Sequence, residues 1–149
     1  MNTPFNEKIY STFSSVASAL GYSEVHGRII SAMLVAGKPM CMDELVKETG
    51  YSSASISLSL DLLEIIGIVK KFRNHGDRKL YVKLDGDLIE GMRSAFLMKL
   101  RKEISVTLSE LDEMKTDEKS RNTIKLLDKE VRRLQEYVTR LSEVPIPKR

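Results

Sequence analysis

Few side chains in this sequence are of the types that carry catalysis or bind metal ions. The chain has one cysteine, Cys41, and two histidines, His26 and His75, without the spacing of a zinc site. It also lacks a glycine-rich phosphate loop and a zinc-protease motif. We interpret Cys41 as a buried, inert thiol, His26 as a helix residue and His75 as a turn residue. The sequence therefore predicts no catalytic residue, no metal and no cofactor, and a protein that is not an enzyme.

Hydroxyl groups are concentrated at the start of a predicted helix over residues 52–66. They belong to Ser52, Ser53, Ser55 and Ser57. Hydroxyls and free amide groups at a helix start can bind phosphates or base edges, which makes these serines candidate DNA-binding residues. The alternative is that they only cap and solvate a surface helix. The same helix carries Asp61 and Glu64 and no basic residue, so bidentate reading of guanine by arginine is excluded here.

A basic cluster follows this helix. Five of the ten residues in 70–79 are basic, with one acidic residue, Asp77. The five, which are our remaining candidate DNA-binding residues, are Lys70, Lys71, Arg73, Arg78 and Lys79. Arginine at the tip of a tight turn can enter a narrow, A·T-rich minor groove. The alternative is a solvated hairpin whose charges protect its edge.

Whole-chain composition limits the class of protein. The 149 residues are 42% hydrophobic and 30% charged, with a net charge of +3, as in an ordinary globular domain. The longest apolar stretch, residues 29–36, is too short to span a bilayer. Because residues 1–8 do not resemble a signal peptide and there is a single cysteine, we expect a cytoplasmic protein without a membrane partner.

The elements that would position these residues can be read from periodicity. Helices are predicted over residues 5–20, capped by Gly21, over 23–37 and over 42–49. A short turn containing Gly50 then leads into the helix that begins at Ser52, which is a helix-turn-helix pattern. The core side of that helix should be Ile56, Leu60 and Leu63.

Gly67 ends that helix, and two β-rich runs follow, joined by a turn at residues 74–77. A hairpin directly after a helix-turn-helix is a wing. The predicted fold is mainly α with a small β wing, a winged helix-turn-helix.

Two long helices are predicted after the wing, over residues 87–115 and, capped by Thr116 or Asp117, up to Pro145. The last helix carries a narrow apolar seam: Ile124, Leu127, Val131, Leu134, Val138 and Leu141. Such a seam needs a helix opposite it, from the same chain or from a second subunit. We favour a mixed arrangement and assign dimerisation to the seam together with the first helix, through Phe5, Ile9 and Phe13.

A family resemblance rests on two runs of residues. They are Ile56-Ser57-x-Ser59-Leu60-x-x-Leu63-Glu64-x-x-Gly67-Ile68-Val69 and Gly76-Asp77-Arg78-Lys79-x-Tyr81. The sequence resembles MarR-type winged helix-turn-helix regulators, and within them the GbsR-like branch. The resemblance implies that Ser57 faces DNA, that Arg78 enters the minor groove, and that a homodimer senses a small-molecule effector. The chain departs from the family at Ser53 and Asp61, where basic or amide side chains are common.

We therefore expect an N-terminal dimerisation helix (1–22), a DNA-binding domain (23–86), a C-terminal dimerisation region (87–144) and a tail (145–149). The predicted function is a sequence-specific, double-stranded DNA-binding transcriptional regulator. We expect a ligand-responsive repressor that acts as a homodimer on a palindromic operator. The alternative is a winged-helix module for protein assembly that does not bind DNA.

Overall fold

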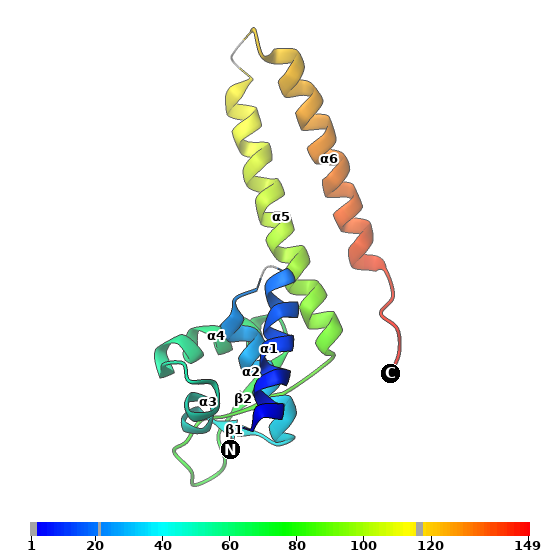
Figure 1. The fold of residues 1–149 in the computed structure, drawn as a ribbon. Coiled ribbons are helices and arrows are strands. Elements are labelled where there is room, and N and C mark those ends of the chain that lie inside the picture. The colour runs from blue at the N-terminus through cyan, green and yellow to red at the C-terminus, as the bar shows by residue number, and fades with distance from the viewer. Residues whose placement is uncertain (1–2, 21, 116–117) are drawn as a thin grey trace. The chain divides into compact units, whose positions relative to one another are not determined.

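The computed structural model describes residues 3–20, 22–115 and 118–149. The chain divides into two units, the first ending at Met92 and the second beginning at Arg93 (Figure 1). We describe each unit by itself. Among the described residues, no helix combines the length and the apolar character that a membrane crossing requires.

The first unit holds four helices and a small sheet. Its elements are α1 (Pro4–Ala19), α2 (Glu24–Ala36), β1 (Met40–Cys41), α3 (Met42–Thr49), α4 (Ser53–Ile65), β2 (Val69–Phe72) and β3 (Tyr81–Leu84). The sheet is antiparallel with the strand order β1-β3-β2. Met40 pairs with Val82, and Val69 pairs with Leu84. The predicted helix-turn-helix and hairpin are confirmed, and β1 is an additional strand that we did not predict.

Helices α1 and α2 approach each other through small residues. A Cβ atom added to Gly27 of α2 would lie 2.6 Å from the Cα of Ser14 in α1, so only glycine allows this spacing. The buried face of α1 is Tyr10, Ser14 and Ala17. Of the α1 residues that we assigned to dimerisation, Ile9 and Phe13 are partly buried against the core of this unit, and Phe5 is exposed. The predicted cap, Gly21, lies outside the described residues.

The core of the first unit joins all of its helices to the sheet. Its buried members include Tyr10, Ile29, Met33, Leu45, Ile56, Leu60, Leu63, Ile68 and Val82. The three residues predicted to form the core side of α4 are among them. Gly67 ends that helix region with a left-handed φ of 78°, a conformation that favours glycine.

The second unit is a helical hairpin of α5 (Leu88–Met114), which starts in the first unit, and α6 (Arg121–Glu143). Its core consists of buried Leu97, Ile104 and Val138, with partly buried residues packed around them. The residue before α6 is Ser120, so the helix starts later than predicted; Thr116 and Asp117 lie outside the described residues.

The apolar seam of α6 is divided between two environments. Val131, Val138 and Leu141 pack in the hairpin core with residues of α5, so these positions have a partner in their own chain. Leu127 and Leu134 are 48% and 41% exposed. The tail beyond α6 is non-helical, and the Arg93 guanidinium donates a hydrogen bond to the Val144 carbonyl.

Candidate nucleic-acid interface

The start of α4 is built by a three-residue turn after α3. Gly50 ends α3 with a φ of 75°, and Ser52 is the N-cap of α4. The backbone N–H of Ser55 donates to the Ser52 hydroxyl oxygen at 3.2 Å. Ser52 therefore serves as a cap, as our alternative interpretation stated. Ser53 and Ser57 are exposed on the same helix, which leaves their hydroxyls accessible to a ligand.

The outer side of α4 also carries apolar groups that we did not single out from the sequence. Leu58 is 74% exposed and Ile65 is 75% exposed. The usual signal of burial, helical spacing of apolar residues, does not separate these two from their buried neighbours, because leucine and isoleucine occupy both sides of this helix.

The two acidic residues of α4 share one counterion, Lys71 of β2. The Lys71 ammonium group forms an ion pair with Asp61 and another with Glu64, the latter at 3.2 Å. The backbone N–H of Lys71 also donates to Glu64 at 3.1 Å. The hydrogen bond to Asp61 is the main cause that raises the pKa of Lys71, and the backbone hydrogen bond from Lys71 is the main cause that lowers the pKa of Glu64. Lys71, a predicted DNA-binding residue, thus has partners inside its own domain.

The wing is held in shape by hydrogen bonds across its tip. The carboxylate of Asp77 accepts from the backbone N–H of Lys79 and from the hydroxyl of Tyr81, each at 2.9 Å. The first of these bonds is the main cause of the lowered pKa of Asp77, and the bond to Asp77 is the main cause of the raised pKa of Tyr81. The rings of Tyr81 and Phe72 stack with their centroids 5.9 Å apart. These contacts give the turn a defined conformation.

The remaining cationic groups of the wing differ in whether they already contact another group of the protein. The Arg73 guanidinium donates to the carbonyl of Arg78 at 2.8 Å, across the hairpin. The Lys79 ammonium lies 4.0 Å from Asp43, and both side chains are well exposed. Lys70 and Arg78 are exposed, and no side chain in the described part of the chain pairs with either of them. These two charges are therefore available to a polyanion.

Among the described residues, the other side chains that we considered for catalysis or metal binding have structural contacts instead. No group of three or more histidine, cysteine, aspartate or glutamate side chains there could hold a metal ion. Cys41 is buried at the start of α3, where its backbone N–H donates to Glu44 at 2.8 Å. This bond is the main cause of the lowered pKa of Glu44. The His26 ring lies 3.1 Å from the Ser23 hydroxyl and contacts Tyr22 edge-on.

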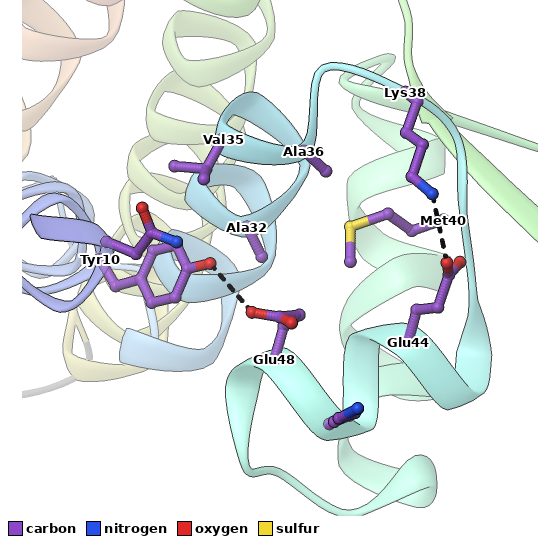
Figure 2. Close-up of a pocket in the computed structure, with 10 residues that line it drawn as sticks. Tyr10, Ala32, Val35, Ala36, Lys38, Met40, Glu44 and Glu48 are labelled. Carbon is purple, nitrogen blue, oxygen red and sulfur yellow. Dashed lines mark hydrogen bonds and ion pairs between the residues drawn. The ribbon is translucent and has the colours of Figure 1, made fainter. Parts of the chain in front are cut away.

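A groove in the first unit is lined by α1, α2 and α3 together with the segment that joins α2 to α3 (Figure 2). Four of the polar groups that line it form two pairs. The Tyr10 hydroxyl donates to Glu48 at 3.4 Å, and the Lys38 ammonium lies 3.6 Å from Glu44. A small molecule that used these groups would have to replace both contacts.

Comparison with solved structures identifies the class of fold. A crystal structure of a transcriptional regulator superposes with a TM-score of 0.63 and 17% sequence identity, covering 94% of this chain and 97% of that one. A crystal structure of NadR in complex with 4-hydroxyphenylacetate gives a TM-score of 0.47 and 17% identity, covering 93% of this chain and 87% of that one. No protein-family model and no curated protein matches the chain. The chain therefore shares its fold with that regulator, and the fold is mainly helical with a small antiparallel sheet.

Proposed function

We propose that this protein is a winged helix-turn-helix regulator that binds double-stranded DNA without catalysing a reaction. One observation carries the proposal. A helix that begins with exposed hydroxyls, α4, is followed directly by a hairpin that presents the unpaired charges of Lys70 and Arg78. The contact of Lys71 with Asp61 and Glu64 joins the two elements and offsets part of the repulsion that α4 would otherwise present to phosphates.

In this proposal α4 enters the major groove and the wing enters the adjacent minor groove. A major groove about 12 Å wide accepts a helix, and a narrow minor groove attracts arginine. Ser53 and Ser57 contact phosphates or base edges, and Arg78 occupies the minor groove. We further propose a repressor that acts as a homodimer on a palindromic operator, because two-fold protein symmetry matches a two-fold DNA site. The MarR-type and GbsR-like assignments stay predictions from the resemblance.

The homodimer is supported by apolar groups that their own chain leaves uncovered. In the first unit this is Phe5 of α1, and in the second unit it is Leu127 and Leu134 of α6. Burying a leucine-sized side chain fully is worth roughly 1.5–3 kcal/mol, so covering the exposed parts of several such residues per subunit favours association.

A titration of labelled duplex DNA at two salt concentrations tests the proposal. Proteins that make about six to ten phosphate contacts lose about 10³–10⁵ in affinity between roughly 50 and 200 mM salt. We expect a loss of this kind. Absence of binding at the lower salt concentration would contradict DNA binding altogether.

Arg78→Ala should weaken binding without unfolding the exposed wing, and the loss should be larger when the flanks of the site are A·T-rich. Lys8→Ala is the matched control, because it removes the same charge from an exposed position on α1. Equal effects of the two variants would show that only net charge matters and that the wing is wrongly placed on the DNA.

The exposed Leu58 and Ile65 favour one alternative, a module for protein assembly that uses the outer side of α4. Such a protein would show neither DNA affinity nor salt dependence in the titration above. The small-molecule effector also stays a prediction. We would look for it first in the groove of Figure 2, which adjoins the first helix of the helix-turn-helix.

A further inference from the structure

The outer face of α4 is unusual for a helix that is proposed to read DNA. No lysine, arginine, asparagine, glutamine or histidine occurs between residues 51 and 69, which include the whole of α4. The side chains that recognise guanine or adenine with paired hydrogen bonds are therefore missing from this element. Serine hydroxyls remain, but they bond to several bases and to phosphate with little discrimination.

One feature of the major groove needs no hydrogen bond to be recognised. Thymine carries a 5-methyl group there, and small or apolar side chains contact it. Leu58 is 74% exposed, and Ala54 lies one turn before it and is also exposed. Residues four apart on a helix lie on the same face, so Ala54 and Leu58 form one short apolar ridge.

The position of this ridge along the helix matters more than its exposure, because single exposed leucines are common on protein surfaces. Ala54 and Leu58 lie in the first two turns of α4, and these turns of a recognition helix contact base edges. Ile65 is equally exposed but lies seven residues, or about 10 Å, further along the helix. Asp61, between the two, forms its ion pair with Lys71.

We propose that Leu58, supported by Ala54, selects thymine in each half-site by contact with its 5-methyl group. This inference rests on the proposed DNA-binding function and makes it more specific. The ridge continues the interface formed by Ser53, Ser57 and the cationic wing, and the electrostatic attraction of the wing holds the helix in the groove. Sequence preference then comes from apolar contact, and affinity comes mainly from charge.

The test uses the full-length protein and a DNA site selected from a random pool. Each thymine of the selected site is replaced in turn by deoxyuridine, which pairs identically and lacks only the methyl group. We expect deoxyuridine at one thymine of a single half-site to lower the affinity about fourfold, and at the matching thymines of both half-sites about fifteenfold. These factors follow from the free energy of burying one methyl-sized group. Where cytosine replaces that thymine, 5-methylcytosine should recover part of the loss.

The variant Leu58→Ser should bind thymine and deoxyuridine sites equally well. The matched control is Ile65→Ser, which removes a side chain of the same size and exposure from the same helix and should keep the full preference for thymine. Both positions are on the surface, so neither substitution should affect folding.

Each other result would overturn the inference. If wild-type protein binds DNA but shows no deoxyuridine effect at any position, DNA binding stands and methyl recognition fails. If Leu58→Ser keeps the preference, a different residue reads the methyl group. If no DNA is selected and Leu58→Ser changes the molecular mass measured by light scattering, the ridge is a protein contact and the proposed function fails too.

Discussion

The two units of this protein differ in how completely they bury their apolar side chains. In the first unit, residues from α1 to α4 and from the sheet meet in one continuous core. In the second unit the buried apolar residues are fewer and include Leu97, Ile104, Leu111, Ile124 and Val138, while several large apolar residues of α6 are exposed. A small pair of helices buries only part of its apolar surface, so the remaining apolar residues of α6 stay open to solvent or to a partner.

If the protein forms the homodimer that we propose, the first unit should be stable mainly through its own packing, and the second unit should gain stability from association. Stability should then rise with protein concentration more strongly for the second unit than for the first, which offers Phe5 to a partner. Four substitutions or changes of condition test this difference.

The largest effect should come from the core of the first unit. Leu60→Ala removes a buried side chain of α4 and should lower the free energy of unfolding by about 2–5 kcal/mol, the usual cost of a cavity. Urea unfolding followed by circular dichroism measures it. Leu58→Ala is the control, two residues away on the exposed side, and should stay within about 0.5 kcal/mol of wild type. Similar losses in both variants would mean that α4 is oriented differently.

The next effect concerns association through the second unit. Leu134→Glu places a charge in the exposed part of the seam and should remove association free energy on the order of 1 kcal/mol per subunit, with helix content unchanged, because less than half of the Leu134 side chain remains to be buried. Sedimentation over a range of concentrations measures it. Leu134 is a better choice than Val131, because Val131 packs within its own hairpin.

Gln135→Glu, an exposed neighbour, is the matched control for added charge and should leave association unchanged. A wild-type protein that is monomeric at all concentrations would contradict the role we give to the second unit.

A smaller effect is expected at the contact of α1 with α2. Gly27→Ala gains about 1 kcal/mol of helix propensity, but its Cβ would meet the backbone of Ser14, and such overpacking costs about 1–3 kcal/mol. Because backbone cannot rotate away as a side chain can, we expect a net loss of stability in thermal unfolding. A gain would show that α1 moves freely against the rest of the first unit.

The smallest effect should be a dependence on pH. The folded state lowers the pKa of Glu64 below its ordinary value of 4.5 through its hydrogen bonds with Lys71. A lowered pKa contributes stability above the unfolded value, and this contribution is lost as the pH falls through the folded value. Wild type and Glu64→Gln should therefore differ slightly at about pH 6 and converge as the pH falls through the folded-state pKa of Glu64. The free energies of unfolding of both proteins are measured in urea across this pH range. A difference between them that does not change with pH would contradict this contribution.

Much of the first unit could be predicted because its signals are local. Caps and glycines mark the ends of α2, α3 and α4, and periodicity identifies the buried side of α4. The strand β1 could not be predicted, because its two residues, Met40 and Cys41, form a strand only by pairing with Val82 and Tyr81. The buried face of α1 was also missed, because Ser14 and Ala17 are small residues that permit close approach to Gly27 and are not counted as apolar anchors.

The candidate nucleic-acid interface could likewise be predicted only in part from the sequence. Serines and basic residues could be found from residue type, but their partners depend on which elements meet. Lys71 was grouped with the other cations because it is near them in sequence, whereas in the structure α4 lies beside β2 and supplies Asp61 and Glu64 as its counterions. Leu58 was not selected because exposure on one side of an apolar helix has no sequence signature of its own.

The short strand β1 has a mechanical consequence. It leads directly into α3 and pairs with β3, the second strand of the wing, so the sheet clamps the hairpin to the start of the helix-turn-helix. In the proposed complex, the distance between the two groove contacts of one subunit, α4 and the wing, is therefore fixed by the sheet. A half-site of different width cannot be accommodated by sliding the wing, and any misfit has to be taken up by bending of the double helix itself.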